Sequence, residues 1–278
     1  MSAGAVEWLA PSSLRDAIAL RAERGDEATV IAGGTFLGIL MNQGFLSPSA
    51  LLSLGGVDEL RGIEVVDGEL RLGATVTHRE LERDARVREA WPMLARAFAV
   101  VASPRVRNQA TVGGVLADAD YASDPPAALQ ALGARAVLRS PAGERIVSIE
   151  ELVLGYYETC IAPDELLVEV RVPAAPARAV YRKFRSRSRE DRPCVAVAAV
   201  RDAQRLRVVV GAVAERPQQF PEVCAVADGR DIDTALAKDI GEGYAEQIAA
   251  IDDARGSAAY RRRVTAVEVR RAIEELAA

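Results

Sequence analysis

The chain has 278 residues, of which half are apolar and 27% are charged, and its formal net charge is −5. This composition is ordinary for one large or two moderate globular domains, and it argues against nucleic acid as a partner. Three widely spaced cysteines and a single histidine fit neither a disulfide framework nor a zinc or iron–sulfur site. No apolar stretch is long enough to span a membrane, and residues 1–8 lack a secretory pattern, so we expect a cytoplasmic protein.

The first 175 residues alternate predicted strands and helices around two glycine pairs. Ser12 or Ser13 is a suitable cap for a helix that runs to about Arg24. Asp67 and Gly68 separate two strand-like runs and predict a tight hairpin. Further helices are expected over residues 77–81, 91–101 and 125–132, and strands over 28–32, 51–54, 62–66, 69–73, 136–139, 145–149 and 166–172.

A small, proline-bearing segment at residues 174–178 predicts a domain boundary. Three strand-like runs follow it, over residues 180–185, 195–202 and 206–214, and two helices end the chain, over about 232–251 and 258–276. Strands followed by helices are typical of a small α+β domain.

The two glycine pairs carry the strongest functional signal. The first is Gly33-Gly34, directly after a predicted buried strand, and the second is Gly113-Gly114. Glycine allows backbone N–H groups to approach a ligand closely, and rows of such groups bind phosphate oxygens. Two loops of this kind would hold a pyrophosphate from two sides.

The order and spacing of these motifs resemble the FAD-binding medium subunit of molybdenum-containing hydroxylases, the family of carbon monoxide dehydrogenase and xanthine dehydrogenase. The resembling segments are residues 32–35, 73–78, 103–114, 117–126, 165–167, Lys183 and 260–262. The resemblance implies an α+β fold of the para-cresol methylhydroxylase type. Its FAD-binding domain would cover residues 1–175, in subdomains of about 1–57 and 58–175, and a C-terminal α+β domain with an antiparallel sheet would cover 178–278.

The resemblance also implies which residues contact FAD. The first loop would present Ala32, Gly33, Gly34, Thr35 and Phe36 to the pyrophosphate. The opposite wall, the ribityl path and the flavin edge would be formed by Val101, Ala102, Thr111, Gly113, Gly114, Ala117, Asp118, Ser123, Asp124, Leu167 and Lys183. Asp124 would accept hydrogen bonds from sugar hydroxyls, and Lys183 would stabilise negative charge on the reduced ring. No catalytic acid or base and no metal ligand is implied in this chain.

Each of these roles has a structural alternative. The glycines also suit tight turns, Asp124 also suits a helix N-cap before Pro125, and Lys183 also suits a solvated strand face. Leu167 also suits the plain core. His78 is expected to be structural rather than a covalent flavin attachment site. Phe36 and Val115 depart from the small or polar residues usual in the family, and both lose a side-chain hydrogen bond to FAD.

The function implied by the resemblance is electron transfer in a larger oxidoreductase. Molybdopterin and two [2Fe–2S] clusters would lie in large and small partner subunits, in a dimer of heterotrimers, and FAD would pass electrons to NAD, a quinone or oxygen. One alternative is a stand-alone flavoenzyme that acts directly on a small molecule. Another is a non-redox scaffold in which FAD is structural or lost.

Overall fold

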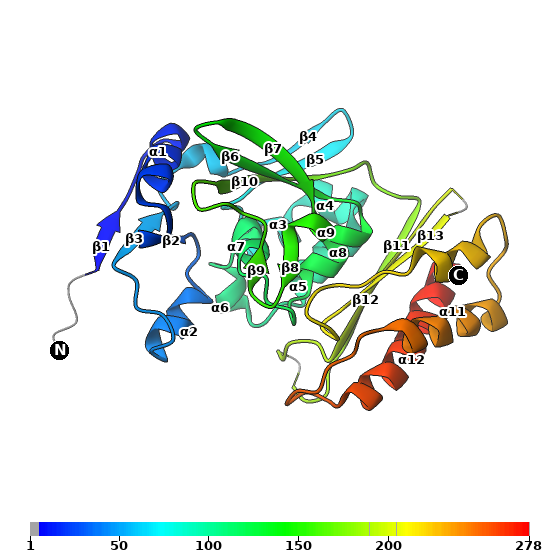
Figure 1. Ribbon diagram of the computed structural model, residues 1–278. Coiled ribbons are helices and arrows are strands. Elements are labelled where there is room, and N and C mark those ends of the chain that lie inside the picture. Colours follow the sequence, from blue (N-terminus) through cyan, green and yellow to red (C-terminus); the bar gives the residue numbers. More distant parts are fainter. Residues whose placement is uncertain (1–5, 189, 204, 278) are drawn as a thin grey trace.

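The computed structural model describes residues 6–188, 190–203 and 205–277, and it shows an α+β protein with three main sheets (Figure 1). The N-terminal sheet is parallel, in the order β1–β3–β2. Its elements are β1 (Glu7–Leu9), α1 (Leu14–Arg24), a 3₁₀ turn (Gly25–Glu27), β2 (Ala28–Ile31), α2 (Leu37–Asn42) and β3 (Ala50–Ser53). The predicted cap of the first helix is confirmed at Ser13, whose hydroxyl accepts from the amide of Asp16 at 3.1 Å.

The central sheet is antiparallel and has five strands in the order β4–β5–β10–β6–β7. These are β4 (Ile63–Val66), β5 (Glu69–Gly73), β6 (Arg135–Ser140), β7 (Gly143–Ser148) and β10 (Leu166–Val172). Asp67 and Gly68 have φ of 52° and 81°, as a two-residue turn between twisted strands requires, so the predicted hairpin is confirmed. A short 3₁₀ turn (Asp58–Leu60) precedes the sheet.

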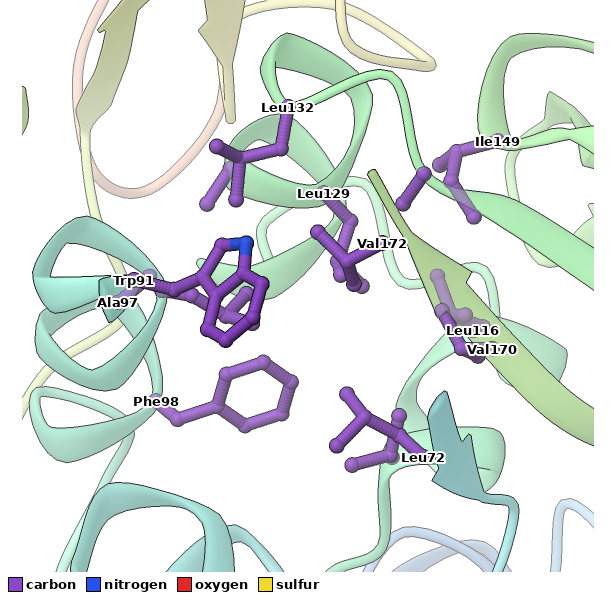
Figure 2. Close-up of a cluster of buried hydrophobic side chains, with 14 of the residues drawn as sticks. Leu72, Trp91, Ala97, Phe98, Leu116, Leu129, Leu132, Ile149, Val170 and Val172 are labelled. Atoms are coloured by element: carbon purple, nitrogen blue, oxygen red, sulfur yellow. The ribbon is translucent and has the colours of Figure 1, made fainter. Parts of the chain in front are cut away.

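Helices pack on one face of this sheet and form the main apolar core. They are α3 (His78–Arg83), α4 (Ala85–Ala90), α5 (Pro92–Ala99), α6 (Pro104–Arg107), α7 (Val112–Ala117), α8 (Pro125–Ala131) and α9 (Ile149–Leu152), followed by the small β8 (Val153–Gly155) and β9 (Glu158–Thr159). Figure 2 shows Trp91 and Phe98 facing Leu129, Val172 and Leu72 within this core. Burial of such side chains stabilises the fold by about 1.5–3 kcal/mol each.

The third sheet joins the C-terminal region to that core. Its strands are β11 (Arg178–Phe184), β12 (Val195–Asp202) and β13 (Arg205–Gly211), all antiparallel, and its helices are α10 (Pro221–Cys224), a 3₁₀ turn (Ala225–Ala227), α11 (Thr234–Gln247) and α12 (Ala258–Ala277). Helices α5 and α8 contact one face, and α12 contacts the other. The central strand β12 is accordingly a run of buried valine and alanine. The division into domains near residue 175 stays a prediction.

Several elements differ from the predictions, mostly around glycine. The second glycine loop contains the helix α7, because Thr111 caps it and tertiary contacts outweigh the poor helix propensity of Gly113 and Gly114. The strand β1 and the helices α2 and α4 are too short to give a periodic signal. The helix expected over 232–251 ends at Gln247, because Ile248 adopts an extended backbone.

Candidate functional site

A cleft of ≈ 560 Å³ lies where the two glycine loops, the start of β10 and the third sheet meet. This volume is within the range of small-molecule and cofactor sites. Every residue predicted to contact the cofactor lines this one cleft: Ala32, Gly33, Gly34, Thr35, Phe36, Val101, Ala102, Thr111, Gly113, Gly114, Ala117, Asp118, Ser123, Asp124, Leu167 and Lys183. The structure therefore brings all of these residues together, whereas their individual contacts with a cofactor stay predictions.

The first glycine loop offers a row of free donors. Among the described residues, the amides of Gly33, Gly34, Thr35 and Phe36 have no hydrogen-bond partner, and neither does the Thr35 hydroxyl. Gly34 has φ of +66°, which favours glycine. Unpaired backbone donors that line a cleft are unusual in a folded protein and fit an anionic ligand such as a pyrophosphate.

The second glycine loop is built differently from the expectation, because the amides of its two glycines are already paired. The amide of Gly113 donates to the Ala74 carbonyl at 2.8 Å, and that of Gly114 donates to the Thr111 hydroxyl at 3.1 Å. Glycine is required here for packing, since a Cβ on Gly113 would lie 2.7 Å from that of Ala74. This loop forms a wall through its shape and does not present the free N–H groups that the glycine pair suggested.

The two loops touch each other directly. A Cβ added to Gly33 would lie 1.9 Å from the carbonyl oxygen of Gln109, which is much closer than any real contact. Gly33 therefore allows the first loop to pack against the backbone that leads into the second. The cleft depends on this approach, because it sets the distance between the free donors of one loop and the wall formed by the other.

His78 supports the second loop from behind. Its ring is 1% exposed, its Nε2 lies 3.2 Å from the Thr111 carbonyl, and it packs edge-to-face against Phe98. The Nδ1 atom has no partner among the described residues. The pKa of His78 is lowered to about 4, chiefly by burial; the Thr111 carbonyl opposes this shift and the nearby Arg107 guanidinium adds to it. The ring is therefore neutral at physiological pH.

A buried ion pair lies between the second loop and the third sheet. The Lys183 ammonium contacts the Asp124 carboxylate at 2.8 Å and donates to the Val100 carbonyl at 2.9 Å. The Tyr181 hydroxyl donates to the other oxygen of Asp124 at 2.6 Å. Burial raises the pKa of Asp124 and lowers that of Lys183, while the attraction between the two charges opposes both shifts.

This arrangement argues against two of the structural alternatives left open by the sequence. Asp124 occupies the cap position of α8, but its carboxylate makes no capping hydrogen bond. Lys183 is not on a solvated strand face, because its side chain is 3% exposed. An ammonium group has three donors, and the described acceptors Asp124 and the Val100 carbonyl occupy two of those of Lys183.

A second charged group borders the cleft at Asp118, Asp120 and Arg192. Arg192 contacts Asp120 at 2.7 Å. The pKa of Asp118 is raised to about 7, chiefly by burial; the charge of Asp120 adds to this shift and Arg192 opposes it. Sequence reasoning missed Asp120, although it lies within the 117–126 motif. It also missed Arg192, which is far away in the sequence and gave no signal.

Further polar residues line the cleft, namely Arg21, Asp26, Thr29, Thr159, Glu165 and Glu190. Of these, only Glu165 lies in a segment that carries the family resemblance. Arg21 donates to the carbonyls of Gly25 and Ala28, which fixes the turn before β2.

Within the described ranges, no helix is long and apolar enough to cross a membrane. The cytoplasmic location stays a prediction.

Two known families together match most of the chain. A family described as "FAD binding domain in molybdopterin dehydrogenase" matches residues 4–175, and one described as "CO dehydrogenase flavoprotein C-terminal domain" matches residues 179–276. The nicotine 6-hydroxylase medium subunit of Paenarthrobacter nicotinovorans is 32% identical, over 100% of this chain and 99% of that protein. The carbon monoxide dehydrogenase medium chain of Afipia carboxidovorans is also 32% identical, over 99% of this chain and 97% of that protein.

Solved structures agree with these sequence matches. Quinoline 2-oxidoreductase from Pseudomonas putida 86 contains a chain with a TM-score of 0.92 and 33% identity, covering 100% of this chain and 98% of that one. Carbon monoxide dehydrogenase from Hydrogenophaga pseudoflava contains a chain with a TM-score of 0.93 and 29% identity, covering 99% of this chain and 98% of that one. The predicted α+β fold, FAD as the cofactor and the assignment as an oxidoreductase subunit are thereby confirmed. The chain belongs to the family of FAD-binding medium subunits of molybdenum hydroxylases.

Proposed function

We propose that this chain holds an FAD that receives electrons from [2Fe–2S] clusters of a partner subunit and passes them to an external acceptor. The observation that carries the proposal is the cleft, in which unpaired backbone donors and a buried lysine line the same space. The unpaired donors suit the pyrophosphate, and the lysine suits the flavin ring, where a cation stabilises the charge of the reduced state.

Within this proposal the contacts are divided along the cleft. The amides of Gly33, Gly34 and Thr35 would bind the pyrophosphate, and the third N–H of Lys183 would face the flavin. Thr111, Gly113 and Gly114 would shape the opposite wall. Val101, Ala102 and Leu167 would border the ring, and Ala117, Asp118, Ser123 and Asp124 would line the sugar and ribityl path. Residues 1–175 would form the binding domain, and residues 178–278 would close over it.

The partners follow from the same assignment. Relatives are named as medium subunits or medium chains, which supports one larger and one smaller partner. We infer that the large subunit binds molybdopterin, that the small subunit carries the [2Fe–2S] clusters, and that the complex is a dimer of heterotrimers. One surface supports such an assembly. Residues 28–57 contain no charged side chain, α2 buries none of its residues, and Ile39 and Phe45 are 48% and 78% exposed. An apolar surface of this kind is typical of a protein interface.

The test is an absorbance spectrum of the complex purified with its natural partners. We expect flavin bands together with broad iron–sulfur absorbance, and both should bleach when a substrate of the complex is added without oxygen. A flavin that is reduced by substrate in the isolated chain would support the stand-alone flavoenzyme instead. Failure of the chain to bind added FAD would overturn the proposal.

One observation favours the stand-alone alternative. Asp118 lines the cleft with a pKa raised to about 7 by burial and by Asp120, which is the range suited to a general acid or base near neutral pH. Direct turnover that is lost in Asp118→Asn, without loss of FAD, would support this second function. If the isolated chain shows no turnover, Asp118 has no such role.

A further inference from the structure

An aromatic pair lies at the edge of the cleft and connects two segments that are far apart in the sequence. Phe36, which follows the first glycine pair, stacks on Tyr157 with a centroid distance of 5.6 Å and an interplanar angle of 9°. Phe36 lines the cleft, whereas Tyr157 lies outside it in the turn between β8 and β9. Such stacked pairs contribute beyond the apolar area that they bury.

Tyr157 is itself held in an unfavourable backbone conformation. Its φ is +56°, a region that tyrosine rarely adopts, and its amide donates to the Ala119 carbonyl at 3.1 Å. Its ring also meets the ring of Tyr121 edge-to-face, with 6.4 Å between centroids. Strain of this kind persists where surrounding contacts impose it, and it is concentrated at functional sites.

Tyr121 anchors this group to the C-terminal part of the chain. Its hydroxyl donates to Asp253 at 3.0 Å and accepts from Arg255 at 2.6 Å, and Asp253 also accepts from the fully buried Arg261 at 2.7 Å. The half-exposed Tyr157 ring thus meets a Tyr121 ring that is itself held by charged and hydrogen-bonded groups. In contrast, the loop that carries Phe36 leads into α2, which buries none of its residues.

We propose that Tyr157 is a positioning residue: its ring holds Phe36 against the cleft and slows the release of the bound cofactor. The inference rests on the proposed function, because it requires FAD in the cleft. Phe36 is the side chain that directly borders the cleft, and Tyr157 acts through it.

The test measures FAD dissociation from the full chain by the recovery of free-flavin fluorescence after dilution. Tyr157→Ala removes the stack, and we expect release about two- to tenfold faster than in the unmodified chain. Tyr157→Phe keeps the ring and should release FAD at the original rate. Tyr156→Ala is a matched control, because Tyr156 is adjacent and similarly exposed but its ring contacts Tyr121 and not Phe36.

A double variant separates positioning from general destabilisation. If Tyr157 acts through Phe36, then F36A/Y157A releases FAD no faster than F36A alone. Equal acceleration by Y156A and Y157A, additive effects of F36A and Y157A, or an unchanged rate in Y157A would each overturn the inference while leaving FAD binding intact. A chain that binds no FAD at all would overturn the proposed function as well.

Discussion

The Lys183–Asp124 pair illustrates how individual residues support both the fold and the site. Asp124→Ala would leave the Lys183 ammonium, 3% exposed, without its carboxylate. Loss of one partner of a buried pair costs about 3–5 kcal/mol, because the remaining charge stays desolvated. We expect this loss in the free energy of unfolding of the FAD-free chain, measured with urea. K183M/D124N should recover most of it, since the Asn oxygen still accepts from Tyr181.

A matched comparison is available on the surface. Lys238 and Glu242 form an exposed i,i+4 pair, 3.6 Å apart and more than half exposed on both sides. Lys238→Met should change the free energy of unfolding by less than about 0.5 kcal/mol. If Asp124→Ala costs no more than this surface variant, then the buried pair does not hold the second loop to β11.

His78 predicts a pH dependence with a defined sign. The folded ring, with a pKa of about 4, stays neutral at pH values where the unfolded ring, with its ordinary pKa of 6.5, takes up a proton. Protonation therefore favours the unfolded state, and this contribution to stability, complete above pH 6.5, is lost as the pH falls towards 4. Its full size is about 3 kcal/mol.

The measurement compares urea unfolding of the unmodified chain and of His78→Gln at several pH values. The stability advantage of the unmodified chain over the variant should decrease by that amount between pH 6.5 and 4. Asp118 titrates over the same interval with the opposite sign, because its pKa is raised in the folded state, but its contribution is common to both proteins and cancels. A difference that is independent of pH would contradict the assignment.

At the scale of elements, the sequence predicted those features that depend only on residues close together in the chain. The Ser13 cap and the Asp67-Gly68 turn are short-range chemistry, and both occur as expected. The amides of the second glycine loop could not be assigned, because Gly113 pairs with Ala74, a contact that depends on the tertiary fold. For the same reason, the sequence placed Asp124 and Lys183 in one site but did not reveal their ion pair.

The contact between the two glycine loops gives a prediction about an element. Gly33→Ala places a methyl group 1.9 Å from the Gln109 carbonyl oxygen, so the first loop must move away from the second. We expect the affinity for FAD to fall by at least about tenfold, since a displacement of the donors forfeits more than one charge-assisted hydrogen bond. Equilibrium titration of the FAD-free chain with FAD measures this change.

Gly38→Ala is the matched control, because Gly38 lies in α2 and an added Cβ would meet nothing within 4 Å. Alanine in a helix is favoured over glycine by about 1 kcal/mol, so this variant should be as stable as the unmodified chain or more so. Unchanged FAD affinity in both variants would show that the spacing of the loops is not what prepares the site.

At the scale of the whole molecule, the third sheet links the cleft to the C-terminal helices. One face of β12 packs on α8, which follows the second glycine loop, and the other packs on α12. Lys183 on β11 reaches the cleft from this sheet, and Asp253 near the start of α12 holds Tyr121. The C-terminal part of the chain therefore contributes to the site as well as to the core.

At the opposite end of the molecule, α2 buries none of its residues against the rest of the chain, and this predicts where a partner binds. The helix α2 projects from the rest of the chain in Figure 1, and the segment around it has no charged side chain. Phe45→Asp places a carboxylate on a position that is 78% exposed, so the fold of the isolated chain should be unaffected. At an interface the same carboxylate would be desolvated without a partner, and we expect loss of co-purification with the other subunits.

Val226→Asp provides the control, because Val226 is 49% exposed and lies in the 3₁₀ turn Ala225–Ala227 of the C-terminal region, far along the sequence from α2. Both variants should bind FAD with unchanged affinity as isolated chains, so a difference in co-purification reports assembly alone. Loss of assembly in Phe45→Asp but not in Val226→Asp would place a subunit on α2. Normal assembly of both would mean that the uncharged surface faces solvent in the complex, and the partner would then have to bind elsewhere.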